Sequence, residues 1–349
     1  MIPSFLTLPI FALDLSDQSY KYLRLEEKKG TVIVADFGEG EIAPGIIEQG
    51  EIKKSDALAA VLKDIFSKKN ICFVAISLPE EKGFLQSIKL VSVKEEEIRQ
   101  ALEFQLEEHI PLPAAETVFD YHVAGNSKDS FDVVVSAFPK HIVDSYAEAI
   151  SQAGAMPVFA ESEIISALRA MLPQKFQKAA LVLDWGRTRT SFSIFEKGTL
   201  RFTSTVYIGG TALNEAITKD LKVDFQKAEE LKKQFGFSRN KESIEVFNAI
   251  VPVVTAIREE TEKYINYWQT HSETKSSVEH IFLSGGDANL LGLPEYLANE
   301  LKIEVSMANP WVNVQFPAKY LPNIEFKDSI RYAPSVGIAL RALDEEKEI

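Results

Sequence analysis

The sequence predicts an α/β protein with two duplicated lobes and a smaller α/β segment inserted into the first lobe. Predicted strands and helices alternate along the 349 residues, which is typical of this class. A strand–turn–strand unit carries an aspartate near the end of its first strand at Asp14, and again at Asp184, about 170 residues later. This long-range recurrence indicates a duplicated architecture, because solenoid repeats recur every ~20–50 residues.

Apolar runs and period-two alternation predict four strands in the first lobe. One helix separates the third strand from the fourth, because its apolar positions recur at helical spacing. In order, these elements are strands over 10–15, 20–25 and 31–37, a helix over 55–66, and a strand over 71–78.

The segment 84–160 reads as β-α-β-β-α-β, which matches the ferredoxin-like or split-βαβ order. Ser92 and Glu95 match a capping box, which predicts that a helix opens there. The helix is expected to stop before Pro111. In order, the elements are a strand over 84–91, a helix over 92–109, strands over 118–123 and 131–138, a helix over 141–153, and a strand over 158–160.

The remaining chain is expected to form a connecting helix, the second lobe and a final helix. Its elements are helices over 161–172, 224–235, 244–268, 294–301 and 333–343, and strands over 180–184, 190–195, 278–283 and 303–306. The expected division is 1–83 with 330–349 as the first lobe, 84–160 as a partner-binding insertion, 161–180 as a connecting helix, 181–221 with 279–329 as the second-lobe core, and 222–278 as its helical subdomain.

Composition excludes several classes of protein. The net charge of −13 disfavours a nucleic-acid backbone binder, which needs a basic surface. A single cysteine, Cys72, excludes a disulfide scaffold and a cysteine-based zinc site, and it fits a reducing compartment. No apolar run reaches the ~18–20 residues that span a bilayer. The apolar stretch Met1–Leu13 has no basic region or cleavage pattern, so no signal peptide is expected. An acidic cytoplasmic protein is the expectation.

Two hairpins form the first candidate site. Turns of small and hydroxyl residues follow Asp14 and Asp184, and such turns can present N–H groups and hydroxyls to phosphate. The two carboxylates could hold a hydrated Mg²⁺, and Lys21 could add a positive charge. Either hairpin alone fits an ordinary polar turn better, but their repetition favours a phosphate site.

Glycine pairs and one helical ion pair form the second candidate site. Gly285 and Gly286 follow a predicted strand, as do Gly209 and Gly210. Such glycines let a ligand approach the backbone, although tight structural turns use them too. Glu229 and Lys232 lie three apart on one helix face, so they could contact a ribose or base, or form a surface ion pair. The sequence contains no P-loop, no zinc-protease helix and no nucleophile elbow.

Taken in order, these segments resemble the actin-like ATPase superfamily and, within it, the PilM family of type IV pilus assembly proteins. The start reads LDLSDQSYK where members read approximately LDIGSSSVK. The most specific signal is EEEIRQALEFQLEEHIPLPAAETVFDYHV at 95–123, in the inserted segment. The resemblance covers nearly the whole chain. The later matching stretches are VLDWGRTRTSFSIFEKGTL, YIGGTALNEAI, AEELK and IFLSGGDANLLGLPEYLANELKIEV.

The resemblance implies a duplicated two-lobe, actin-like (ribonuclease H-like) ATPase fold that binds ATP and Mg²⁺. Asp14 and Asp184 would be the metal-side carboxylates, and Glu163 would act with Asp184 as a catalytic group by orienting water. Glu163 could equally be a first-turn carboxylate favoured by the helix dipole. The cofactor-binding residues would be Asp14, Ser16, Asp17, Gln18, Ser19, Lys21, Gly186, Arg187, Thr188, Thr190, Gly209, Gly210, Glu229, Lys232, Gly285, Gly286 and Asp287.

Two residues depart from the family pattern in the first phosphate turn. Ser16 replaces a glycine, and Asp17 adds a carboxylate that would repel a triphosphate. Arg187 and Arg189 make the second turn basic and could compensate. ATP binding with weak or absent hydrolysis is therefore expected.

By the same resemblance, the chain would be a scaffold at the cytoplasmic face of the inner membrane. It would bind the N-terminal cytoplasmic peptide of PilN, together with other proteins of the pilus inner-membrane complex, and it would reach the membrane only through its partner. No nucleic-acid partner is expected, and self-association stays open. Peptide capture would involve the inserted segment and its groove with the first lobe.

The helix over 92–109 is the expected peptide contact. It is acidic, with Ile98, Leu102 and Leu106 on another face, and such a surface could bind a peptide with basic flanks and apolar anchors. Its glutamates could equally be a solvated face. The alternatives are a small-molecule kinase, for which no substrate base is evident, and an FtsA-like division protein, which would need a C-terminal amphipathic membrane helix.

Overall fold

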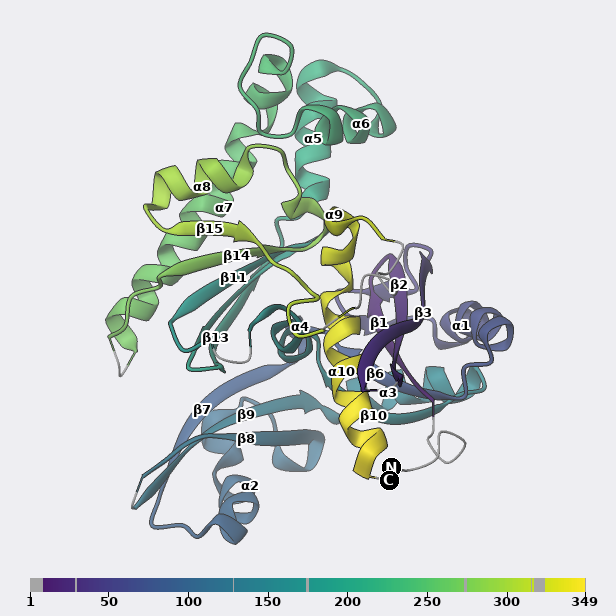
Figure 1. Cartoon of the computed structure of the whole chain (residues 1–349), viewed down its shortest axis with the longest axis vertical. Coiled ribbons are helices and arrows are strands. Elements are labelled where there is room, and N and C mark those ends of the chain that lie inside the picture. The colour runs from purple at the N-terminus through teal and green to yellow at the C-terminus, as the bar shows by residue number, and fades with distance from the viewer. Residues whose placement is uncertain are drawn as a thin grey trace. The chain divides into compact units, whose positions relative to one another are not determined.

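The computed structural model describes residues 9–28, 30–127, 129–173, 176–272, 275–314, 316 and 324–348 (Figure 1). Residues 1–8 of the apolar N-terminal stretch lie outside this description. The chain divides into two compact units, which are taken in turn. The first contains Met1–Gln174, Pro310–Ile324 and Tyr332–Ile349, and the second contains Lys175–Asn309 and Glu325–Arg331.

The first unit is built on a five-stranded mixed sheet in the order β10-β6-β1-β2-β3. Strands β1, β2 and β3 are antiparallel neighbours, whereas β6 runs parallel to β1 and β10 runs parallel to β6. The strands are β1 (Ile10–Ser16), β2 (Ser19–Lys28), β3 (Thr31–Glu41), β6 (Phe73–Leu78) and β10 (Met156–Ser162).

Four helices pack against this sheet. Helices α1 (Ser55–Lys69) and α3 (Lys140–Gln152) contribute their apolar faces to one buried core with β1 and β6. Helix α10 (Ala333–Glu348) packs on β1 and β2 and lies along α4 (Glu163–Met171). A two-stranded ribbon of β4 (Ile47–Glu48) and β5 (Glu51–Ile52) follows β3.

A separate antiparallel sheet in the order β7-β9-β8 completes the first unit. Its strands are β7 (Phe84–Val91), β8 (Thr117–Ser127) and β9 (Ser130–Pro139). Helix α2 (Ile98–His109) covers one face, and Ile98, Leu102 and Leu106 are buried there. A short 3₁₀ turn over Glu95–Glu97 leads into α2, and the Glu97 carboxylate accepts the Lys94 N–H at 3.3 Å. The capping box predicted for Ser92 and Glu95 is therefore wrong.

The β-α-β-β-α-β order is present along the chain, but the single ferredoxin-like sheet expected from it is not. Strand β10 pairs with β6 of the five-stranded sheet. Helix α3 buries Ile142, Tyr146 and Ile150 in the core of that larger sheet. Local periodicity identifies a strand without showing which strand it pairs with. The prediction therefore assigned α3 and β10 to the wrong sheet.

The second unit repeats the five-stranded topology in the order β13-β12-β11-β14-β15. Its strands are β11 (Ala180–Trp185), β12 (Thr190–Glu196), β13 (Thr199–Val206), β14 (His280–Ser284) and β15 (Glu304–Met307). Its helices are α5 (Gly210–Leu221), α6 (Phe225–Phe235), α7 (Ile244–His271), α8 (Leu293–Leu301) and α9 (Phe326–Ser329). Among the described residues, no helix combines the length and apolarity needed to cross a membrane.

The two sheets confirm the predicted duplication. In each, three antiparallel strands are followed by two parallel strands on the other side of the first. Asp14 lies opposite Lys21 across the first hairpin, and Asp184 lies opposite Ser191 across the second. The two aspartates therefore occupy equivalent register positions.

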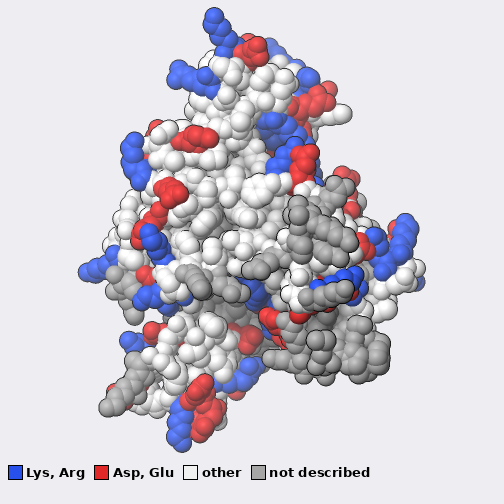
Figure 2. Space-filling view, in the orientation of Figure 1, with Lys and Arg blue, Asp and Glu red and all other residues white. Residues whose placement is uncertain are grey.

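Charged side chains of both signs are interspersed on the face shown in Figure 2. At its lower end, where Figure 1 places α2, acidic and basic side chains lie together. Arg99 and Glu103 form an ion pair of 3.8 Å on this helix. Part of the acidic charge of α2 is therefore paired within the helix.

Replacing Gly337 with alanine should destabilise the first unit by roughly 1–3 kcal/mol. A Cβ at this position of α10 would lie 1.7 Å from the Ser166 carbonyl oxygen of α4, so the two helices would have to separate. Urea unfolding followed by circular dichroism measures the change. The control is Gly125→Ala in β8, where the nearest atom to a Cβ is 3.4 Å away. A midpoint for Gly337→Ala at or above that of the control would contradict this close approach.

Candidate functional site

In the first predicted phosphate hairpin, the polar side chains pair with one another and with a serine of β6. Asp14 is buried, and its Oδ1 accepts a hydrogen bond from Ser77 Oγ at 2.6 Å. Its Oδ2 lies 3.4 Å from Lys21 Nζ, which is also buried and lies 3.4 Å from Ser19 Oγ. Lys21 was predicted as a phosphate contact, and in this unit its charge is balanced by Asp14.

The departures from the family pattern in this turn have a local structural explanation. Ser16 and Ser19 form the last strand pair, so Asp17 and Gln18 make a two-residue loop. The Ser16 hydroxyl lies 2.8 Å from the Ser19 hydroxyl and donates to the Ser19 carbonyl at 3.0 Å. Both carboxylate oxygens of Asp17 accept backbone N–H groups, from Gln49 at 3.1 Å and Gly50 at 3.0 Å. Asp17 therefore anchors the loop before β5.

Glu163 is the first residue of α4, and its Oε1 accepts the Glu80 N–H at 3.0 Å. This contact joins the start of the helix to the turn after β6. A carboxylate in a first helical turn is also stabilised by the helix dipole. The contact fits the structural alternative, and the water-orienting role stays a prediction.

The second hairpin turn packs on the start of α5. Its Gly186 N–H donates to the Arg189 carbonyl at 2.9 Å, and Thr190 Oγ1 donates to the Ile208 carbonyl at 2.6 Å. The N–H groups of Gly210 and Thr211 donate to the Gly186 and Arg187 carbonyls at 3.0 and 2.9 Å. The turn therefore satisfies the first amides of α5 with backbone carbonyls.

Two of the predicted glycines are required by close approach to carboxylates. Gly285 has a φ of +88°, and a Cβ there would lie 2.5 Å from Asp184 Oδ1. A Cβ on Gly210 would lie within 2.1 Å of both Asp287 carboxylate oxygens. The aspartates thus fill the space that side chains at these positions would need.

Lys232 joins two carboxylates in a buried charge network. Its Nζ lies 2.6 Å from Asp287 Oδ1 and 2.9 Å from Glu229 Oε2. Burial favours the neutral form of Glu229, but hydrogen bonds from Lys232 and Asn214 outweigh it and lower its pKa to about 2. Burial raises the pKa of Asp287 against the opposing effect of Lys232.

The structure thus brings together Gly186, Arg187, Gly209, Gly210, Glu229, Lys232, Gly285 and Asp287 within the second unit, through the contacts to the α5 start and the Lys232 network. Gly286 begins the short 3₁₀ turn that carries Asp287. Thr188 lies in the loop between β11 and β12. Asp14, Ser16, Asp17, Gln18, Ser19 and Lys21 lie together on the first hairpin. No group of three or more His, Cys, Asp or Glu side chains suited to a metal occurs among the described residues. The Asp14–Asp184 magnesium pair stays a prediction.

The first unit also contains a pocket of about 460 Å³. The sequence predicted only a groove between the inserted segment and the first lobe, without its lining residues. The pocket lies between strands β8 and β9 of the small sheet and elements β10, α3, α4 and α10. The face of β9 that turns away from α2 contributes Val134, Ser136 and Phe138, because alternate residues of that strand turn toward α2. The volume is within the range of about 300–1,000 Å³ common for ligand sites.

The pocket lies on the face of the small sheet opposite α2. The apolar stripe of α2 predicted to hold a peptide is wholly used as core against β7 and β9. Ile98 and Leu102 have no exposed surface. The peptide contact predicted for the helix over 92–109 is therefore wrong for its apolar face.

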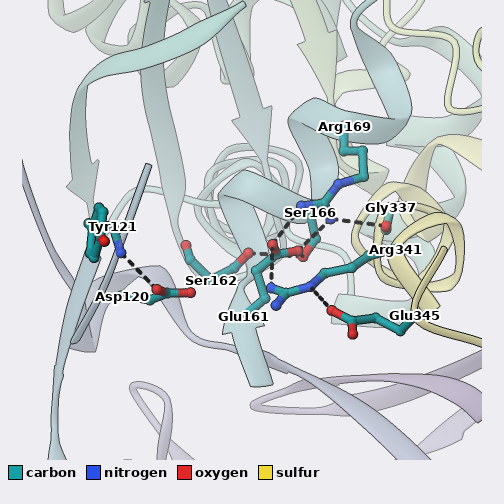
Figure 3. Close-up of polar contacts among 9 residues, drawn as sticks. All are labelled: Asp120, Tyr121, Glu161, Ser162, Ser166, Arg169, Gly337, Arg341 and Glu345. Carbon is teal, nitrogen blue, oxygen red and sulfur yellow. Dashed lines mark hydrogen bonds and ion pairs between the residues drawn. The ribbon is translucent and has the colours of Figure 1, made fainter. Parts of the chain in front are cut away.

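One wall of the pocket is an ion-pair cluster centred on Glu161 (Figure 3). Arg169 of α4 lies 2.5 and 2.6 Å from its two carboxylate oxygens, and Arg341 of α10 lies 3.0 Å away. Ser166 also donates to it at 2.8 Å. Burial favours the neutral form of Glu161, but these partners together lower its pKa below the ordinary value.

The comparisons with known proteins agree with this architecture. A family model described as type IV pilus assembly protein PilM matches residues 12–343. The chain belongs to the PilM family. A solved "PilM-PilN type IV pilus biogenesis complex" matches with a TM-score of 0.82 and 22% identity, covering 97% of this chain and 99% of that chain.

More distant structures share the two-lobe actin-like fold of this PilM-family chain. MreB5 of Spiroplasma citri bound to AMPPNP matches with a TM-score of 0.57 and 14% identity, covering 97% of this chain and 98% of that one. The ethanolamine utilization protein EutJ from Carboxydothermus hydrogenoformans has a TM-score of 0.57 and 16% identity, over 95% and 88%.

Glu229→Gln should lower the free energy of unfolding near pH 7 by about 1–3 kcal/mol. The folded pKa of about 2 lies below the ordinary glutamate value of 4.5, so the ionised carboxylate stabilises the fold above about pH 5 and loses this effect as pH falls toward 2. Denaturant unfolding at pH 7 and pH 3 measures it. Glu230→Gln is the matched control, because Glu230 lies on the same helix and forms an exposed pair with Lys227 at 3.0 Å. An equal loss for Glu229→Gln at both pH values would contradict the assignment.

Proposed function

We propose that this PilM-family chain is a scaffold of the type IV pilus machinery that binds the N-terminal segment of PilN in the pocket of the first unit. The single observation that carries the proposal is this pocket. It borders the sheet of the inserted segment, for which the family resemblance of the sequence implies partner binding. Support also comes from the "PilM-PilN" complex, whose PilM-like fold spans 97% of this chain. Neither the kinase nor the FtsA-like alternative is favoured by the family match.

The pocket has the chemistry of a peptide site. Val118, Val134, Phe138 and Val143 supply apolar surface from three elements. The Glu161 carboxylate pairs with both Arg169 and Arg341, and Arg341 also pairs with Glu345 of α10. Apolar walls with a few placed polar groups are typical of sites that select a short segment. Binding here would attach the scaffold to the cytoplasmic face of the inner membrane through PilN.

Nucleotide binding is the second part of the proposal. The actin-like fold is shared with MreB5, which was solved with AMPPNP. In this chain Asp184 is half-buried beside Gly285, and a single carboxylate with waters and phosphate oxygens is a usual way to hold Mg²⁺. Bound ATP would supply the phosphate oxygens. Its binding energy would favour one conformation of the protein. The second unit would contribute Asp184, the turn over 186–190 and the glycines at 285 and 286.

Val118→Arg should weaken binding of the PilN segment about tenfold or more, because it removes apolar surface and places a charge in the pocket. Isothermal titration with a peptide of the PilN N-terminus from the same organism measures it. Val91→Arg is the matched control: Val91 is also exposed on the same small sheet but lies outside the pocket, at the end of β7. Equal affinities for both variants would place the peptide elsewhere.

The wild type should bind ATP·Mg²⁺ in a calorimetric titration, and Asp184→Ala should abolish this binding. The substitution removes the carboxylate that would hold the metal, while β11 keeps its backbone pairing. Asp224→Asn in the same unit is the control, because Asp224 caps α6 by accepting the Lys227 N–H at 2.8 Å and asparagine caps equally well. No heat with the wild type would remove nucleotide from the proposal and leave the PilN scaffold standing.

A further inference from the structure

We propose that the pocket binds its peptide as an added β-strand along the outer edge of β8, with alternate peptide side chains turned toward the apolar lining formed by Val118, Val134, Phe138 and Val143. This inference rests on the proposed function, since it states how the same pocket holds its partner. The occupant is an extended segment whose apolar side chains alternate. A helical segment laid in the pocket is the competing arrangement.

Strand β8 is an open edge. It is the outer strand of the order β7-β9-β8, and no described strand pairs with its other side. It is also long, at 11 residues. Exposed edges of this kind present unpaired N–H and C=O groups and are templates for strand addition.

The pocket follows this edge. Five consecutive residues of β8, Val118 to His122, border it. Successive side chains of a strand turn to opposite faces, and Phe119 and Tyr121 pack against the core beneath α2. The pocket therefore contacts residues whose side chains point to opposite faces of β8. A cavity of this kind lies along the edge of the strand, where backbone groups are accessible, as well as over one face.

One backbone group on this edge already has a local partner that a ligand could replace. The Tyr121 N–H donates to Asp120 Oδ1 of the preceding residue at 2.9 Å (Figure 3). An amide satisfied by the neighbouring side chain is typical of an outward-facing edge position, where charge also guards against unwanted pairing. An incoming carbonyl can take this N–H without breaking a bond of the β8–β9 ladder.

The facing edge strand, β10, is less suited to accept a strand. It borders the pocket through Ala160, Glu161 and Ser162. However, Pro157 removes one N–H from β10, and its register shifts between Pro157 and Phe159. The pocket therefore has a regular strand edge on the β8 side and an interrupted one on the β10 side.

The test is a backbone scan of the PilN segment. A set of peptides carries one N-methyl group at each successive amide, and the affinity of each is measured by titration against the full chain. Strand addition predicts losses of about tenfold or more at every second position, with small changes at the intervening ones, because alternate residues direct their N–H groups to one neighbour. Methylation at the intervening amides is the internal control for solubility and peptide conformation.

A second readout uses the unmodified chain and peptide. Exchange of the Tyr121 amide with deuterated solvent, followed by NMR, should slow about tenfold or more at saturating peptide. Binding of the unmodified peptide with no period-two pattern, or with unchanged Tyr121 exchange, would overturn strand addition while leaving PilN as the partner. No binding of the unmodified peptide would overturn the proposed function and this inference together.

Discussion

The architecture of the first unit depends on one buried carboxylate. Glu161, at the end of β10, holds Arg169 of α4 and Arg341 of α10. Arg169 also donates to the Gly337 carbonyl at 3.1 Å, at a point where α10 approaches α4 closely. A strand of the central sheet, the following helix and the last helix of the chain are thus joined at a single ionic centre. Because that centre also forms a wall of the pocket, the packing of the fold and the shape of the site are linked.

A charge cluster of this kind specifies geometry more than it adds stability. Burying ions costs desolvation free energy that their attraction only roughly offsets. Removing one partner is far more costly, because it leaves a buried charge unpaired. Arg341 also lies 4.6 Å from the centre of the Phe159 ring and 3.4 Å from Glu345, so three contacts set its position. The position of α10 is therefore sharply defined where it borders the pocket. In the second unit, two carboxylates pair with the buried Lys232 ammonium. This network likewise specifies geometry more than it adds stability.

The features that could be predicted from the sequence are those encoded locally. Apolar runs and turn residues predicted both hairpins, and their recurrence predicted two equivalent sheets. Pairings between distant segments could not be predicted in this way: Glu161 and Arg341 are 180 residues apart, and nothing near either residue indicates the other. The sheet to which β10 belongs was missed for the same reason. One signal was available, however. A two-residue loop at Asp17 and Gln18 places Asp14 directly opposite Lys21, so their ion pair follows from hairpin register alone.

The small sheet shows why partner contacts are difficult to infer from a helical wheel. Helix α2 has a clear apolar stripe, and that stripe is core because an isolated three-stranded sheet needs a covered face to be stable. The other face meets the pocket, where Val134 and Phe138 are each 5% exposed, and the β8 edge stays open among the described strands. Val118 retains 42% of its surface there, whereas the alternating Val133 and Val135 of β9 are fully buried beneath α2. In such an insertion the acidic, amphipathic helix supports the sheet, and the sheet provides the surface that can bind a partner.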